Sequence, residues 1–151
     1  MKICEINWSK WYSFKELEKL GFKPIPVSKG VYQIRCAVKG RPIVISRAGG
    51  NDEDGILYIG KTESKQGLRH RIRLFWKGVH ERGKTLEELS VPHTGANTYV
   101  IYGFSRKFPI DCLEVRWAIV DNPSEVERKL LREYAERYLD KPPLNLSIRR
   151  R

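Results

Sequence analysis

Cysteine is scarce in this sequence, and its cysteines stand far from one another. There are three, at Cys4, Cys36 and Cys112, and no CxxC pair is present. A structural zinc site needs closely spaced ligands, and a disulfide framework is normally built from an even number of cysteines. We therefore expect neither, and predict that the three side chains are buried, reduced thiols.

Long apolar runs and nucleotide-binding motifs are missing as well. No stretch approaches the roughly 20 apolar residues of a membrane-spanning helix, and the N-terminal MKICEINWSKW lacks the apolar run of a signal peptide. Neither GxxxxGKS/T nor GxGxxG occurs. These absences predict a cytoplasmic protein with no membrane partner, and they give no support to a nucleotide cofactor.

Acidic residues are few relative to basic ones. The 18 Asp and Glu side chains are outnumbered by 29 Lys and Arg, which gives a net charge of +11. Such an excess favours a polyanionic partner, and a nucleic acid is the commonest one for a domain this basic. Charge alone does not separate DNA from RNA, and a basic surface that is merely solvated is the alternative.

The chain has the size of one domain, which we place at residues 1–151. Helical spacing of apolar residues predicts helices at 13–20, 66–80 and 122–139, with a short one at 85–89. Runs rich in β-branched and aromatic residues predict strands at 30–38, 42–46, 56–62, 98–104 and 112–120. This order predicts a mixed α/β (α+β) fold, with a small, mainly antiparallel sheet flanked by helices.

The start of the last helix carries a capping signal. Ser124 is followed three residues later by Glu127, which is the pattern of a capping box. In that interpretation Ser124 accepts from the backbone N–H of residue 127, and the glutamate has a structural task. Any catalytic role for Glu127 has to be weighed against this one.

Two tyrosines occur in matching contexts on predicted strands. Tyr32 ends the motif GVY, and Tyr58 begins the motif YIGK, so each has a glycine nearby. Taken singly, a tyrosine on a strand is more often a packing residue whose hydroxyl lies at the edge of the core. The pair becomes informative only together with the motifs that follow it.

An ordered set of motifs continues after the second tyrosine. GLRHRI contains Arg71, a glutamate lies on the last helix, and PPLN ends at Asn145. This set resembles the GIY-YIG endonuclease family over residues 30–145, with a basic tail at 146–151. The resemblance implies a small antiparallel sheet flanked by helices, on which these elements converge to form one phosphate-binding face.

The resemblance also implies roles for the side chains. Tyr32 orients or deprotonates the attacking water, and Tyr58 holds that water or the phosphate. Lys61 lies next to this pair, where a cation lowers the pKa of a phenol. Arg71 forks onto the scissile phosphate in a bidentate contact, the alternative being an ordinary surface arginine on a basic helix.

A single carboxylate is expected to hold the divalent ion. The resemblance assigns this task to Glu127, with Mg²⁺ as the metal and Mn²⁺ as a substitute. Glu133 competes, because its distance from Asn145 is closer to the spacing in some members of the family. Glu127 is preferred because leucines follow it at +3 and +4. Asn145 is expected to hydrogen-bond within the site and support it.

Two features depart from the family pattern. One turn after Arg71 the chain has Phe75, where many relatives have a tyrosine or histidine, so His70 or His80 is left to fill that helper role. Tyr58 also follows Tyr32 by 26 positions. That step is long for the family and predicts an inserted hairpin, which is a common loop variation.

Basic residues on one helix form the predicted contact with the nucleic acid. They are Lys65, Arg69, Arg73 and Lys77, which we expect to form a stripe beside Arg71, with Arg149 to Arg151 as a second clamp. Such contacts position a phosphate backbone without reading its sequence. The resulting hypothesis is a metal-dependent DNA endonuclease that hydrolyses phosphodiester bonds with an activated water. The alternative is a catalytically silent nucleic-acid-binding module on the same fold, and a homodimer is one way for a single site to cut both strands.

Overall fold

We describe a computed structural model of the protein, which places residues 5–81 and 88–146. Cys4, the basic tail at 149–151 and most of the helix predicted at 85–89 lie outside the described residues. Of the other cysteines, Cys36 is buried and Cys112 is half-buried, and both are free thiols. Within the described residues no helix is both long and apolar enough to cross a lipid bilayer.

The sheet is built around β2 (Gly30–Val38). This strand pairs antiparallel with β7 (Leu113–Ile119) on one side and with β6 (Ile56–Thr62) on the other. The short strand β1 (Tyr12–Ser13) extends the sheet beyond β7, and β3 (Arg41–Pro42) pairs with the end of β2. Every pairing is antiparallel, which confirms the predicted α+β fold.

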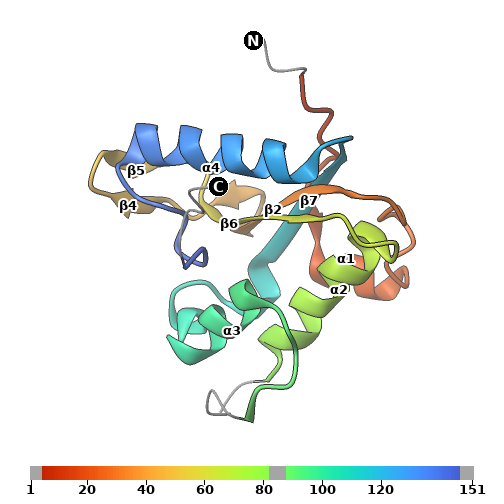
Figure 1. Cartoon of the computed structure of the whole chain (residues 1–151). Coiled ribbons are helices and arrows are strands. Elements are labelled where there is room, and N and C mark those ends of the chain that lie inside the picture. The colour runs from red at the N-terminus through yellow and green to blue at the C-terminus, as the bar shows by residue number, and fades with distance from the viewer. Residues whose placement is uncertain (1–4, 82–87, 147–151) are drawn as a thin grey trace.

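Helices cover both faces of this sheet. α4 (Pro123–Tyr138) lies along one face, and α1 (Phe14–Lys19), α2 (Gly67–Val79) and α3 (Thr94–Ile101) gather on the opposite side (Figure 1). The larger apolar core lies on the side of α1 to α3, and the smaller one lies beneath α4. The tyrosine-bearing strands β2 and β6 are therefore sandwiched between the two groups of helices.

The first two helices form as their sequences predict. The Ser13 hydroxyl caps α1 by accepting from the backbone N–H of Glu16, and Gly21 follows the helix with a φ of +63°. The predicted apolar stripe of α2 is buried, including Ile72 and Phe75. Both predictions are confirmed, because apolar spacing and capping agree with the tertiary packing.

The capping box predicted for α4 is wrong. Asn122 is the N-cap residue and Pro123 stands at the first helical position, where a missing N–H costs nothing. Ser124 instead donates its hydroxyl hydrogen to Glu63 Oε1 at 2.8 Å. Glu127 consequently lies deeper in the helix than a capping-box glutamate does, so the structural task predicted for it does not exist.

The strand predicted at residues 98–104 is wrong as well. These residues belong mainly to α3, followed by a 3₁₀ turn at Phe104–Arg106. The helix is capped by the side chain of His93, and it buries Ala96 and Tyr99, packing against α2. Packing has overridden the strand preference of the β-branched and aromatic residues, as tertiary context often does.

The long step between the two tyrosines contains the predicted hairpin. The predicted strand at 42–46 is divided between β3 and β4 (Ile45–Arg47), and β4 pairs with β5 (Gly50–Asp52). The hairpin is fastened to the C-terminal end of α4. The Gly49 N–H donates to the Tyr138 carbonyl at 2.9 Å, and Arg47 pairs with Asp140 at 2.9 Å.

Asp52 fixes the base of this hairpin from a buried position. Its carboxylate accepts backbone N–H groups of Asp54, Gly55 and Ile56 at 3.0–3.1 Å, and the Tyr134 hydroxyl of α4 at 2.9 Å. We expect Asp52→Ala to lower the free energy of unfolding by about 3 kcal/mol, because buried donors lose their acceptor. Urea unfolding measures it, with the exposed Asp54→Ala as control. Equal losses in both variants would contradict this role.

Candidate active site

A pocket of about 360 Å³ opens where β6, α2 and α4 meet. Five residues of the predicted site line it: Tyr58, Lys61, Arg71, Glu127 and Asn145, together with Thr94, Leu131 and Leu146. They come from four segments, of which β6 and α2 lie early in the chain while α4 and the segment of Asn145 lie more than 40 residues later, and the fold brings the two groups together. These predicted residues therefore share one site, although Tyr58 and Glu127 are 69 residues apart in the sequence.

Tyr32 lies behind this pocket on the central strand, with no exposed surface. Its ring centroid is 5.9 Å from that of Tyr58, and its hydroxyl lies 2.7 Å from His93 Nε2. Burial raises the pKa of Tyr32 well above its ordinary value, Tyr58 raises it further, and the neighbouring Arg71 lowers it. At neutral pH the Tyr32 phenol therefore carries its proton.

Two glycines leave the space that the tyrosine rings occupy. A Cβ at Gly60 would stand 2.5 Å from Tyr32 Cζ and 2.6 Å from Tyr58 Cε2. A Cβ at Gly95 would stand 2.8 Å from the Tyr58 ring. Neither glycine has a positive φ. The glycine of the YIGK motif is thus needed for the close approach of the two rings rather than for its backbone conformation.

We expect Gly60→Ala to displace both rings and to lower the free energy of unfolding by about 2 kcal/mol, as overpacking does. Near-ultraviolet circular dichroism reports the tyrosine environment, and urea unfolding reports the stability. Gly21→Ala is the control, since that residue has a φ of +63° and open space around it. It is expected to lose stability with an unchanged tyrosine signal, whereas an unchanged spectrum for Gly60→Ala would refute the steric interpretation.

Arg71 is held at the mouth of the pocket. It lies on α2, half-buried, and its Nη1 donates to the Pro92 carbonyl at 3.0 Å. The same guanidinium is close enough to Tyr32 to lower the pKa of that phenol through charge and hydrogen bonding. Arg71 therefore has an environment different from that of an ordinary surface arginine, which was the alternative interpretation.

The two candidate glutamates of α4 point in different directions. They are six residues apart, which places them about 120° apart around the helix axis. Glu127 is half-buried and lines the pocket, whereas Glu133 is exposed on a separate groove beside Arg132 and Glu136. Only Glu127 of the two reaches the pocket.

Asn145 joins the segment after the double proline to the strand that carries Tyr58. Its Oδ1 accepts the Ile59 N–H at 3.1 Å, and its Nδ2 donates to the Ile59 carbonyl at 2.9 Å. Both ends of the amide are therefore occupied by the backbone of β6. This arrangement fits the predicted supporting role and leaves Glu127 as the carboxylate side chain at the pocket.

His93 is the residue that sequence reasoning missed. It is fully buried, its ring lies 5.3 Å from Tyr58 and 5.3 Å from Phe75, and its Nε2 contacts the Tyr32 hydroxyl. Burial, and then the neighbouring Arg71, lower the pKa of His93 to about 3. The predicted strand at 98–104 hid this histidine, because it placed residue 93 in a loop instead of at a helix cap.

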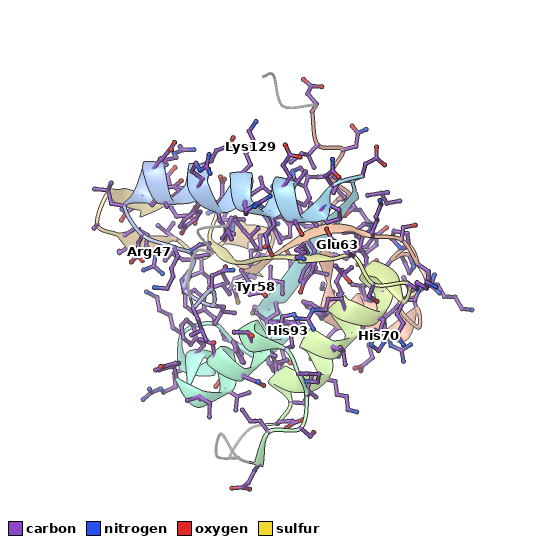
Figure 2. All side chains as sticks on the ribbon, viewed as in Figure 1. Arg47, Tyr58, Glu63, His70, His93 and Lys129 are labelled. Carbon is purple, nitrogen blue, oxygen red and sulfur yellow. The ribbon has the colours of Figure 1, made fainter. Side chains whose placement is uncertain are left out.

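Neither histidine proposed for the helper role enters the site. His70 is exposed on the side of α2 away from Tyr58 and His93 (Figure 2). His80 packs edge-on against Trp76, and its Nδ1 lies 2.6 Å from the Trp76 carbonyl oxygen. Both line another pocket. The imidazole in contact with Phe75 thus comes from the start of α3.

The predicted basic stripe lies on a different side of α2 from Arg71. Arg69 and Arg73 are each two positions from Arg71, which corresponds to about 200° around the helix axis. Arg73 and Lys77 line a separate pocket with Phe22. The guanidinium of Arg69 donates hydrogen bonds to the carbonyl oxygens of Ile25 and Lys23, at 2.8 and 3.2 Å. Lys65 is exposed. The binding role of this stripe stays a prediction, but its place beside Arg71 is wrong.

The donor set of the pocket suits a hard cation with few protein ligands. In the part of the chain that the structure describes, no three side chains of His, Cys, Asp or Glu come together as a ready-made metal cage. Mg²⁺ does not require one, because it keeps several waters and is commonly held by one or two carboxylates. A half-buried glutamate facing a 360 Å³ pocket is compatible with that mode of binding.

Comparison with known proteins returned no match among protein-family models, curated proteins or solved structures.

Proposed function

We propose that the protein is a metal-dependent DNA endonuclease that acts in the cytoplasm, and that the pocket of Tyr58, Arg71 and Glu127 is its active site. One observation carries this proposal. The side chains that the GIY-YIG resemblance selects from four separate segments converge on a single pocket, with Tyr32 directly behind it. Residues with unrelated packing roles have no reason to converge in this way.

The cations of the pocket suit a phosphodiester. The guanidinium of Arg71 presents a rigid fork of donors to phosphate oxygens, and Lys61 adds a second positive charge from β6. The bond from Arg71 to the Pro92 carbonyl holds the fork before the substrate binds. Such prearranged charge stabilises the negative charge that develops on phosphorus in the transition state.

The tyrosines and the glutamate supply the remaining functions. In hydrolysis the water oxygen bonds to phosphorus, the bond from phosphorus to the leaving deoxyribose oxygen breaks, and the water loses a proton. Tyr58 lines the pocket and holds the water or the phosphate. Tyr32, whose phenol carries its proton at neutral pH, orients the water, and it can take the proton of the water only after it has released its own to solvent. Glu127 would hold Mg²⁺, which when bound supplies positive charge against the phosphate and the leaving oxygen.

A labelled DNA duplex tests this proposal. It is incubated with the wild-type protein in Mg²⁺, in Mn²⁺ and in chelator, and the samples are run on denaturing and native gels. Shortened strands in either metal and none in chelator are expected. A duplex that is shifted on the native gel but never shortened would replace the nuclease with the silent binding module, for which Phe75 in the helper position is the motivating observation.

A further inference from the structure

His93 has two hydrogen-bonding partners, and they impose different demands on its two ring nitrogens. Nδ1 caps α3 by accepting the backbone N–H of Ala96, at 3.3 Å. Nε2 lies 2.7 Å from the Tyr32 hydroxyl oxygen. A backbone amide can only donate, so Nδ1 must present a lone pair to it.

A neutral imidazole carries one N–H, and that hydrogen must then be on Nε2. His93 is kept neutral by its surroundings: it is fully buried, and the positive charge of Arg71 acts against a second positive charge on the ring. The groups packed around the ring are Tyr32 of β2, Tyr58 of β6, and Arg71 and Phe75 of α2. None of these carries the negative charge that would favour an imidazolium.

We infer that His93 is a positioning residue that donates a hydrogen bond from Nε2 to the Tyr32 oxygen, and that the cap of α3 fixes the tautomer which makes this possible. The catalytic meaning of this inference rests on the proposed function, whereas the assignment of the tautomer does not depend on it. In this arrangement His93 cannot act as the base that removes the Tyr32 proton, because its Nε2 already carries a hydrogen.

This tautomer fixes the direction of the hydrogen bond between His93 and the Tyr32 hydroxyl. Its oxygen accepts from Nε2 of His93, and the guanidinium of Arg71 is close enough to lower the pKa of the phenol. The hydrogen of its own hydroxyl is therefore available only to a third group, such as a phosphate oxygen or water. The same two groups would stabilise the phenolate if Tyr32 takes part as a base, so in either protonation state the oxygen is held in place by α2 and α3.

Nuclear magnetic resonance of the ring nitrogens tests the inference on the wild-type protein. The sequence has three histidines, so His93→Asn assigns the signals of His93 by difference. We expect an unprotonated Nδ1 and a protonated Nε2 that do not change between pH 5 and pH 8. A hydrogen on Nδ1, or titration near the ordinary pKa of histidine, would overturn the inference whether or not the protein cuts DNA.

Two substitutions separate the cap from the donor. Asparagine is a preferred N-cap residue, so His93→Asn retains an acceptor for Ala96 but is too short to reach Tyr32. Glutamine has an amide nitrogen at about the distance of Nε2, so His93→Gln retains the donor and weakens the cap. We expect His93→Asn to lower kcat about tenfold at unchanged KM, with a lower Tm because the vacated ring leaves a cavity and Tyr32 loses a partner, and His93→Gln to retain kcat with a lower Tm because the cap is weakened. The reverse pattern of kcat would show that His93 acts only as a helix cap.

Discussion

Glu127→Gln is expected to lower the cleavage rate on the order of a thousandfold. The amide keeps the shape of the side chain and removes the negative charge that Glu127 brings to the pocket. The affinity for DNA should change little, since Lys and Arg contacts to phosphate dominate it. Single-turnover cleavage of a labelled duplex in Mg²⁺ measures the rate, and fluorescence anisotropy in chelator measures the binding.

Glu133→Gln is the matched control for this experiment. It makes the same chemical change on the same helix, at an exposed position that faces a different groove. We expect it to cut at the wild-type rate. Wild-type cleavage by Glu127→Gln, or a loss confined to Glu133→Gln, would refute the assignment of the metal-binding carboxylate.

Acid is expected to destabilise the fold through His93. The pKa of this histidine is about 3 in the folded protein, below the ordinary value of 6.5 that it has when unfolded. Between these values the unfolded chain binds a proton that the folded protein does not. The contribution of His93 is therefore constant above about pH 6.5 and falls by roughly 1.4 kcal/mol for each pH unit below it.

Urea unfolding between pH 4 and pH 8 measures this effect. The wild type is compared with His93→Asn, which keeps a cap residue and has no titrating ring at this position. The two proteins differ only at residue 93, so the difference in slope between their stability curves reports the titration of His93. Parallel curves for the two proteins would mean that residue 93 is protonated as readily in the folded state as in the unfolded one.

The sheet and most helices were predictable because local and global preferences agree there. β6 spans Ile56–Thr62 as predicted, and α2 buries the apolar stripe seen in its sequence. The tyrosines, Arg71 and Glu127 were selected by the order of motifs along the chain, and the fold brings them together. Periodicity predicts the elements, and motif order predicts the site residues, because both can be read along the sequence without knowing which distant segments are in contact.

The errors occur where a contact between distant segments decides the structure. Residues 98–104 have the composition of a strand, but packing against α2 and the His93 cap make most of them helical. Ser124 has the position of a cap, but it bonds to Glu63 of another segment. His93 itself follows a proline in a stretch without periodicity, and its contacts with Tyr32 and Tyr58 in the folded protein mark it as part of the site.

Relaxation of a supercoiled plasmid in Mg²⁺ tests most directly whether this pocket cleaves DNA. The wild type is compared with the double variant Arg71→Ala, Glu127→Gln, purified in the same way so that a contaminating nuclease would appear in both. We predict nicked or linear plasmid with the wild type in Mg²⁺, and only supercoiled plasmid with chelator or with the double variant. Equal cleavage by both proteins, or supercoiled plasmid throughout, would contradict the proposed active site.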